Sequence, residues 1–247
     1  MDLYQYPEVY DAFHDWKTDD IDFIVSESIR IGGPILELAA GTGRLGLPIA
    51  VTGSTYRGIE LSQQYVDLGN KKLSNSIDAR LFQGDMCTYL SIEKFKFIFI
   101  GFNSLLHLQN DEDIRDCFNA TANNLDDKGL FLIDIFMPDP DYLYRDPEVE
   151  SEFHNFNHPE KGQCTAFEKG DYDPETGILH VTWRFHYGDR FQDESFEFDM
   201  NILFPDQMDR FLEETNWSII KKYGDYDRSV MKPHSPKQIY LCKKKSK

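Results

Sequence analysis

Between residues 34 and 136 the chain alternates short apolar runs with longer amphipathic segments, and this alternation constrains the fold most strongly. Such an order is typical of βαβ units and a parallel sheet. Strands are expected at five apolar runs, which are 34–38, 56–60, 79–83, 95–101 and 130–136. Helices are expected between them, at 43–52, 62–75 and 111–125. Two of the strands, "FKFIFIG" and "LFLIDIF", are almost continuously apolar, as expected for central strands covered on both faces.

After residue 137 the pattern changes. Three prolines and several acids in "FMPDPDYLYRDPEVE" predict a loop or turn-rich passage. Three segments then alternate as antiparallel strands do, at 163–170, 177–187 and 191–203. A helix at 205–215 precedes "WSIIKKY" and "QIYLCKK", a strand pair expected at the sheet edge. We therefore predict an α/β fold, a Rossmann-like doubly wound and mostly parallel seven-stranded sheet with an antiparallel β insertion after strand five.

The length and charge of the chain limit its domain organisation and its partners. With 247 residues the chain is long enough for one sizeable core, so we expect a single domain, 1–247. Two helical pieces are expected within residues 7–30, ahead of the sheet. Lys and Arg number 26 against 43 Asp and Glu, and the formal charge of −17 repels phosphate backbones and anionic lipids. Neither nucleic acid nor membrane is expected as a partner.

The four cysteines are far apart and form no C-x-x-C pair, so no metal site is expected and the thiols fit a reducing compartment. The N-terminus "MDLYQYPEVYDAFHDW" lacks the basic and apolar regions of a signal peptide, and no apolar run is long enough to span a bilayer. A soluble, cytoplasmic protein is expected, either monomer or homodimer.

The stretch "ILELAAGTGRLG", residues 35–46, matches two nucleotide-binding patterns. From Gly41 its spacing is G-x-G-x-x-G, the fingerprint of a dinucleotide site, which is weak evidence alone. From Glu37 it is an acidic strand end followed by a turn of small residues, as in a site for S-adenosylmethionine. Glu37 decides between them, because a carboxylate there repels a pyrophosphate and suits an ammonium group. Gly46 is then expected to serve only close helix packing.

Two further carboxylates fit the cofactor. Glu60 ends the second strand, where it can accept both ribose hydroxyls of either cofactor. Asp85 follows the third strand, where it can accept the exocyclic amine of adenine while Met86 packs on the ring. A dinucleotide site has less need of Asp85, so Asp85 favours S-adenosylmethionine, whereas Glu60 does not discriminate between the two cofactors.

The motifs "ELAAGTGR", "GIELS", "QGDM" and "FIFIGFNSLLHL" resemble, in order and spacing, those of class I S-adenosylmethionine-dependent methyltransferases over residues 34–136. Glycine often stands in that family where this chain has Ala39, and we expect the alanine to be tolerated. The resemblance implies a set of cofactor-binding residues. They are Glu37, Ala39, Gly41, Gly43, Arg44, Glu60, Leu61, Asp85, Met86, Phe102 and Asn103.

A second resemblance covers the remainder of the chain. "PEVYDAFHDW", "NSLLHL" and "ESFEFDMNILFPDQMDRFLEETNW" are similar to small-molecule N-methyltransferases that dimethylate amino sugars in bacterial secondary metabolism. It implies an N-terminal helical lid at 1–32 and, at 140–203, an antiparallel β insertion over the acceptor pocket. A small-molecule methyl acceptor is thus expected, with nitrogen favoured over oxygen.

Methyl transfer from a sulfonium needs alignment, exclusion of water and, for an ammonium acceptor, removal of a proton. His107, just past the fourth strand, is the candidate base, with a structural or helix-capping role as the alternative. Tyr10 is the second catalytic candidate, through a cation–π contact with the sulfonium worth about 0.5–2 kcal/mol, unless it only packs the first helix. Asn103 and Ser104 are expected to position the methyl donor or to cap the next helix.

Acceptor contacts are expected after strand five and in the insertion. The candidates are Phe136, Met137, Asp139, Arg184, His186 and Tyr187, with Asp139 facing a cationic acceptor. An antiparallel strand with one packed and one wet face is the alternative for the last three. His14, Trp16 and Lys17 belong to the lid or to an ordinary helix surface. The other functions left open are a small-molecule O-methyltransferase, an NAD-type oxidoreductase and a non-catalytic cofactor-binding protein.

Overall fold

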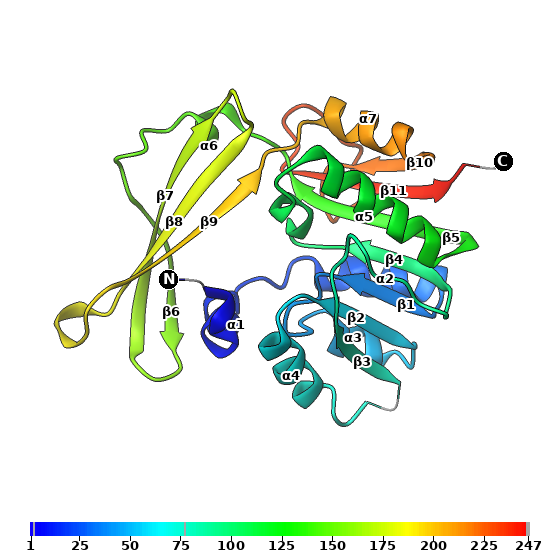
Figure 1. Cartoon of the computed structure of the whole chain (residues 1–247). Coiled ribbons are helices and arrows are strands. Elements are labelled where there is room, and N and C mark those ends of the chain that lie inside the picture. Colours follow the sequence, from blue (N-terminus) through cyan, green and yellow to red (C-terminus); the bar gives the residue numbers. More distant parts are fainter. Residues whose placement is uncertain (2, 77, 246–247) are drawn as a thin grey trace. The chain divides into compact units, whose positions relative to one another are not determined.

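The computed structural model describes residues 1, 3–76 and 78–245, which form two compact units. The smaller unit contains residues 1–18 and 138–202, and the larger one contains residues 19–137 and 203–247 (Figure 1). The segment 1–32, predicted as one N-terminal lid, is therefore divided between the two units after Thr18. None of the helices that the structure describes is long and apolar enough to cross a membrane.

The larger unit is built on a seven-stranded sheet. In chain order its strands are β1 (Ile35–Leu38), β2 (Tyr56–Glu60), β3 (Ala79–Gln83), β4 (Phe95–Ile100), β5 (Leu125–Phe136), β10 (Trp217–Tyr223) and β11 (Lys237–Lys244). They are arranged as β10-β11-β5-β4-β1-β2-β3. The pairs from β5 to β3 are parallel, whereas β11 runs antiparallel to both β5 and β10. The predicted mostly parallel, seven-stranded sheet with a terminal strand pair is confirmed.

Helices cover both faces of this sheet. One face is packed by α2 (Ile21–Ile31), α3 (Gly46–Val51) and α4 (Gln63–Lys72), whose apolar side chains share a core with those of β1, β4, β5 and β11. On the other face α5 (Asp111–Asn124) places Phe118 edge-on against Phe131, 5.7 Å between ring centroids, and contacts α7 (Pro205–Glu214). The doubly wound prediction is thus confirmed (Figure 1).

The strand order reverses between β1 and β4, which makes their carboxyl ends the switch point of the sheet. The two strands are paired in register, Glu37 with Phe99 and Leu38 with Ile100. Open α/β sheets bind their ligands in the crevice that forms beyond such a reversal. The short helix η2 (Ser104–His107) follows directly after β4 at this edge.

The smaller unit holds a four-stranded antiparallel sheet, ordered β6-β7-β8-β9. Its elements are η1 (Leu3–Gln5), α1 (Pro7–Phe13), α6 (Pro140–Leu143), β6 (Ser151–His158), β7 (Gly162–Asp173), β8 (Ile178–His186), η3 (Gly188–Arg190) and β9 (Glu194–Asn201). Phe13 of α1 packs on the sheet, 4.9 Å from Phe185 and 5.4 Å from Phe156 between ring centroids. The antiparallel insertion predicted after strand five is confirmed.

A strand and an α-helix of this unit were not predicted. Strand β6, "SEFHNFNH", was missed because only Phe153 and Phe156 interrupt its polar residues. Helix α6 lies inside the passage predicted as loop, where Asp139 caps it by accepting a hydrogen bond from the Asp141 N–H at 3.0 Å. Strand β5 also begins at Leu125, five residues earlier than expected, through the polar stretch "LDDKG".

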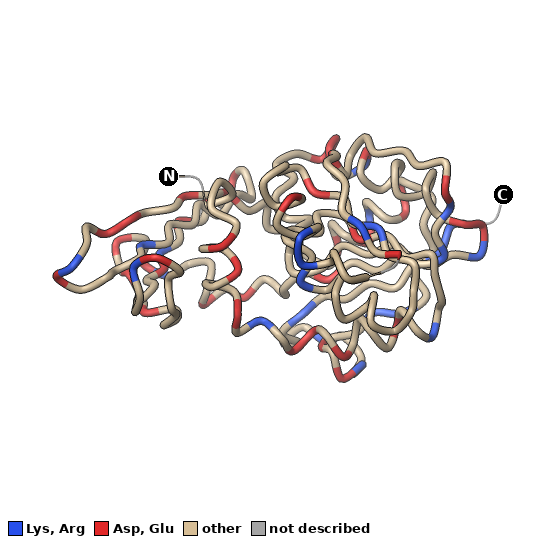
Figure 2. The backbone as a smooth tube through the Cα atoms, turned by 90° about the horizontal axis from the view of Figure 1, so that it is seen from below, with Lys and Arg blue, Asp and Glu red and all other residues tan. Residues whose placement is uncertain are grey.

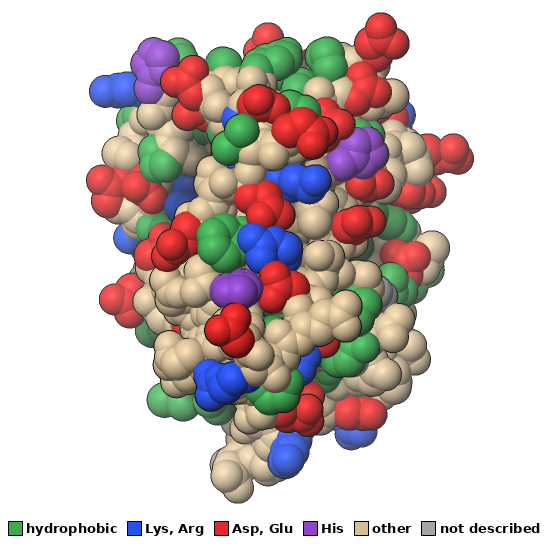
Figure 3. Space-filling view, turned by 90° about the vertical axis from the view of Figure 1, so that its left-hand side faces the viewer, with side chains coloured by type: hydrophobic (Ala, Val, Ile, Leu, Met, Phe, Trp, Pro, Cys, Tyr) green, Lys and Arg blue, Asp and Glu red, His purple; other side chains and the backbone are tan. Residues whose placement is uncertain are grey.

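Acidic residues are distributed along both units, as the tube in Figure 2 shows. On the face of the molecule displayed in Figure 3, acidic side chains are spread among fewer basic ones. A net charge of −17 favours the approach of cations over that of anions.

Candidate active site

After β1 the backbone turns sharply through residues of left-handed conformation. Ala39, Gly41 and Gly43 have φ values of 55°, 57° and 77°. A Cβ on Gly41 would meet no other atom within 4 Å, so the turn faces open space there. A Cβ on Gly46 would lie 2.5 Å from the ring of Tyr56, which bears out close packing as the role of Gly46.

Glu37 is buried at the carboxyl end of β1, with 5% of its surface exposed. The hydroxyl of Tyr56 donates a hydrogen bond of 2.5 Å to its Oε2. Burial raises the pKa of Glu37 to about 8, although the Tyr56 hydrogen bond and the charge of Arg44 oppose this shift. Among the described residues no group donates a hydrogen bond to its other oxygen, Oε1. Glu37 therefore has an acceptor available for a positively charged ligand group.

Glu60 ties the glycine turn to the end of β2. Its Oε2 accepts a hydrogen bond from the Gly41 N–H at 3.0 Å, and its Oε1 accepts one from the Ser62 N–H at 2.9 Å. Burial raises the pKa of Glu60, and these two bonds partly oppose the shift. A carboxylate has about four lone-pair sites, so both oxygens can accept further bonds from a diol.

The end of β3 lies beside the end of β2, since Glu60 pairs with Gln83. Asp85 is exposed there, and its Oδ1 accepts a hydrogen bond from the Cys87 N–H at 2.8 Å. Next to Glu60, Leu61 leaves 70% of its surface exposed, and Met86 is half-buried. An exposed apolar side chain beside a fixed acid suits a planar ring that carries polar groups.

The side chain of Arg44 is held by other residues of the larger unit. Its guanidinium forms two hydrogen bonds of 2.7 Å with Asp20 and lies 5.4 Å from the centroid of the Phe102 ring. Asp20 is fully buried at the residue preceding α2. The sequence did not single out Asp20, because in "TDDI" nothing distinguishes it from a surface acid.

After β4 the chain makes a second left-handed turn. Phe102 and Asn103 have φ values of 50° and 63°. The side-chain oxygen of Asn103 accepts a hydrogen bond from the Phe136 N–H at 2.7 Å, which joins the turn to the end of β5. The predicted residues Asn103 and Phe136 are thus in direct contact.

His107 ends η2, beyond this turn. Its side chain has solvent access, yet the surrounding protein displaces enough water to lower its pKa below the ordinary value. The imidazole is consequently neutral at pH 7 and has a lone pair that can accept a proton.

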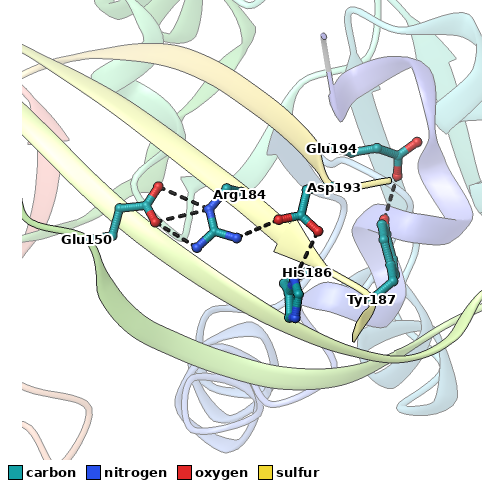
Figure 4. A network of polar contacts seen from close by, with 6 residues as sticks. All are labelled: Glu150, Arg184, His186, Tyr187, Asp193 and Glu194. Carbon is teal, nitrogen blue, oxygen red and sulfur yellow. Dashed lines mark hydrogen bonds and ion pairs between the residues drawn. The ribbon is translucent and has the colours of Figure 1, made fainter. Parts of the chain in front are cut away.

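In the smaller unit, Arg184 and His186 lie on one face of β8, and Phe185 is buried on the other, as is Tyr187 just after the strand. Figure 4 shows the polar network of the first two. Arg184 binds Glu150 at 2.7 Å and Asp193 at 2.6 Å, and His186 lies 2.9 Å from Asp193.

Tyr187 donates a hydrogen bond of 2.5 Å to Glu194. Buried and solvent-accessible residues thus alternate, as in an antiparallel strand with one packed and one solvated face. A contact of these residues with the acceptor stays a prediction. Tyr10 packs against the core of the same unit, with its ring centroid 4.1 Å from that of His14. The catalytic role of Tyr10 likewise stays a prediction.

Comparisons with known proteins agree with this geometry. Residues 35–129 match the family model described as a methyltransferase domain. The YqeM protein of Bacillus subtilis (strain 168), a candidate methyltransferase, is 25% identical over 156 residues. That alignment covers 60% of this chain and 60% of the length of YqeM.

Solved structures share the fold over nearly the whole chain. The CcbJ methyltransferase from Streptomyces caelestis has a TM-score of 0.82 at 19% identity, covering 99% of both chains. An S-adenosylmethionine-dependent methyltransferase from Clostridium acetobutylicum has a TM-score of 0.79 at 19% identity, covering 98% of each chain. CalS10, an amino pentose methyltransferase from Micromonospora echinaspora, has a TM-score of 0.68 at 14% identity, covering 99% of this chain and 97% of CalS10.

The prediction of a methyltransferase domain is confirmed by the family match, and the fold is confirmed by the structures. S-adenosylmethionine as the cofactor agrees with this family match and belongs to the function proposed below. The glycine-rich stretch at 35–46 lies within the matched residues, in spite of its literal dinucleotide spacing.

Proposed function

We propose that the chain transfers the methyl group of S-adenosylmethionine to a small-molecule acceptor, and that the receiving atom is an amine nitrogen. The observation that carries the cofactor part is the buried carboxylate of Glu37, whose Oε1 accepts no hydrogen bond from the described residues. Because burial disfavours its ionised form, this group becomes charged most readily beside a cation, and the α-ammonium group of S-adenosylmethionine supplies one.

The other contacts of the cofactor follow from the strand ends. Glu60 holds the ribose hydroxyls, because the Gly41 and Ser62 N–H groups already fix the direction of its carboxylate. Asp85 accepts a hydrogen bond from the adenine amine, and the apolar side chains of Leu61 and Met86 flank the ring. When bound, the cofactor supplies an activated methyl group on a cationic sulfur.

His107 is the proposed base. Because its pKa is lowered, it is unprotonated at neutral pH and accepts the proton that a protonated amine must lose. The nitrogen–carbon bond then forms as the sulfur–carbon bond breaks, and the proton remains on His107. An amine acceptor is supported by the acidic character of the chain, and CalS10, which shares the fold, is named as an amino pentose methyltransferase.

The acceptor side of the proposal rests on the smaller unit and on the end of β5. We assign acceptor recognition to Phe136, Asp139, Arg184 and His186, and contact with the sulfonium to Tyr10. Several further expectations stay predictions. They are the lid at 1–32, the covering of the acceptor pocket by 140–203, dimethylation of the acceptor, the cytoplasmic location and the oligomeric state as monomer or homodimer.

The test is incubation with S-adenosylmethionine that carries a deuterated methyl group, together with a panel of amines, phenols and metabolite extract, followed by mass spectrometry. The expected result is a product heavier by one or two labelled methyl groups on nitrogen. Methylated phenols alone would reassign the acceptor to oxygen. Binding of S-adenosylhomocysteine with no product from any extract would favour a non-catalytic protein, and binding of NAD instead would favour an oxidoreductase.

A further inference from the structure

The turn after β4 is held in a conformation that its residues disfavour. Phe102 and Asn103 are consecutive residues with positive φ, 50° and 63°, and neither is glycine. Such backbone persists only where surrounding contacts determine it, and it is concentrated at functional sites. The contacts that hold this turn therefore deserve a functional test.

Asp134 of β5 makes two of these contacts. Its Oδ2 accepts a hydrogen bond from the Phe102 N–H at 3.3 Å, and its main-chain oxygen accepts one from the Asn103 N–H at 3.1 Å. The side chain is buried in an otherwise apolar central strand, with 3% of its surface exposed. A carboxyl group buried in that environment requires hydrogen-bond donors that hold it in place.

Tyr226 supplies such a donor from a distant part of the chain. Its hydroxyl donates a hydrogen bond of 2.7 Å to the same Oδ2 of Asp134. Burial and the charge of Asp134 raise the pKa of Tyr226, so the hydroxyl keeps its proton. The ring lies 5.6 Å from that of Phe23 in α2, between centroids, and Lys237 lies 4.6 Å from its centre.

The loop that carries Tyr226, residues 224–236, is itself fixed to α2. Arg228 forms hydrogen bonds of 3.2 and 2.9 Å with Glu27, which is buried, and its guanidinium lies 5.0 Å from the centre of the Phe23 ring. The residue before α2 is Asp20, which binds Arg44 of the glycine turn. The loop 224–236 thus contacts β5, which holds the turn after β4, and α2, which begins next to the partner of Arg44 in the glycine turn.

We propose that Tyr226 is a positioning residue for methyl transfer: through Asp134 it fixes the Phe102–Asn103 turn and so the placement of the η2 helix that ends in His107. The inference rests on the function proposed above. Tyr226 acts through Asp134 and is assigned no contact with the methyl donor or the acceptor.

The test compares Tyr226→Phe with Tyr223→Phe. Both variants lose one hydroxyl and keep a ring near Phe23, since the Tyr223 ring lies 6.1 Å from it. Tyr226→Phe is expected to lower kcat about tenfold, with KM for S-adenosylmethionine and the melting temperature nearly unchanged. Amide hydrogen exchange at Phe102 and Asn103 is expected to accelerate about tenfold, while exchange in β1 and β2 stays as in the parent. Tyr223→Phe is expected to change each quantity less than twofold.

Asp134→Asn gives a second route to the same answer if Tyr226→Phe folds poorly. Because both changes act on the same hydrogen bond between Tyr226 and Asp134, the double variant is expected to lose no more in kcat than the less active of the two single variants. Independent, multiplied losses would overturn the proposal, as would a lowered kcat without faster exchange at Phe102 and Asn103. Equal effects of the two tyrosine changes would also overturn it. Hydrogen exchange needs no acceptor, so its result stands even if no methylated product is found and the proposed function fails.

Discussion

Replacing Glu37 by glutamine should stabilise the ligand-free protein and lower its affinity for the cofactor. Burial raises the pKa of Glu37 to about 8, far above the value near 4.5 of an exposed glutamate. Because the pKa is higher in the folded state, the folded protein keeps this proton while the unfolded chain releases it. The stabilisation of the folded state that comes from binding this proton is complete below pH 4.5, and it is lost as the pH rises towards 8. The slope is about 1.4 kcal/mol per pH unit.

At pH 7 the accumulated cost is at most about 3 kcal/mol. Glutamine keeps the shape of the side chain and does not ionise. For a chain of this size 1 kcal/mol corresponds to roughly 2–4 °C in melting temperature. Glu37→Gln should therefore raise the melting temperature at pH 7 by several degrees, up to about 10 °C, and by much less at pH 5.

The effect on the cofactor has the opposite sign. Binding the ammonium group requires ionised Glu37, so between pH 6 and 7.5 the Kd of the parent should fall about tenfold per pH unit, with close to one proton released. Above that range the amino group of the cofactor, with a pKa of about 7.7–8.0, begins to lose its own charge. Glu37→Gln removes a hydrogen bond to a charged group, so at pH 7.5 affinity should drop by about 10- to 150-fold.

Titration calorimetry in buffers of different ionisation enthalpy measures both Kd and proton release, and thermal melts at pH 5, 7 and 8 measure stability. Glu213→Gln, an exposed change in α7, is the control and should match the parent in both. If Glu37→Gln melts at the parent's temperature at every pH and keeps the parent's pH-dependent affinity, the reasoning on Glu37 is wrong.

Three other changes address the turn, the packing and the base. Ala39→Gly should raise the free energy of unfolding by about 1 kcal/mol in urea titrations, because φ is 55° at Ala39 and glycine has no Cβ penalty there. Gly46→Ala should lower it by about 1–3 kcal/mol, since the new Cβ meets the ring of Tyr56; an unchanged urea midpoint would contradict the packing. His107→Asn should lower kcat at least a hundredfold while S-adenosylhomocysteine affinity persists. At saturating S-adenosylmethionine it should also remove the acidic limb of the kcat/KM profile for the acceptor, which in the parent lies below pH 6.5. A preserved acidic limb would assign the base to another group.

The parallel sheet was predictable because each buried strand is a continuous apolar run bounded by turns. The same criterion failed at β6, where an edge strand with "SEFHNFNH" carries few apolar residues. The helices at 43–52 and 62–75 proved shorter, Gly46–Val51 and Gln63–Lys72, because the turns before them occupy part of each range. Periodicity identified the elements, whereas local hydrogen bonds set their ends.

The site could be predicted only where it follows a strand directly. Glu37 and Glu60 end strands, so sequence position alone placed them at the ligand edge. Asp20 and Tyr226 contribute to the site through hydrogen bonds with Arg44 and Asp134, which lie far from them in the chain. No local sequence pattern indicates such pairs. Asp134 did leave a signal, since a single acid within "LFLIDIF" implies a buried carboxylate that needs a donor.

Backbone strain in the larger unit is concentrated around the cofactor site. Of the five non-glycine residues with positive φ that the structure describes, Ala39, Phe102 and Asn103 lie in the turns after β1 and β4, the two strands at the switch point. Hydrogen bonds within the protein, from Gly41 to Glu60 and from Phe102 to Asp134, hold these turns. A ligand that enters a turn already fixed in this way loses less free energy to ordering it. Ala39→Gly should therefore gain stability without gaining affinity, because the geometry that glycine would ease is already in place.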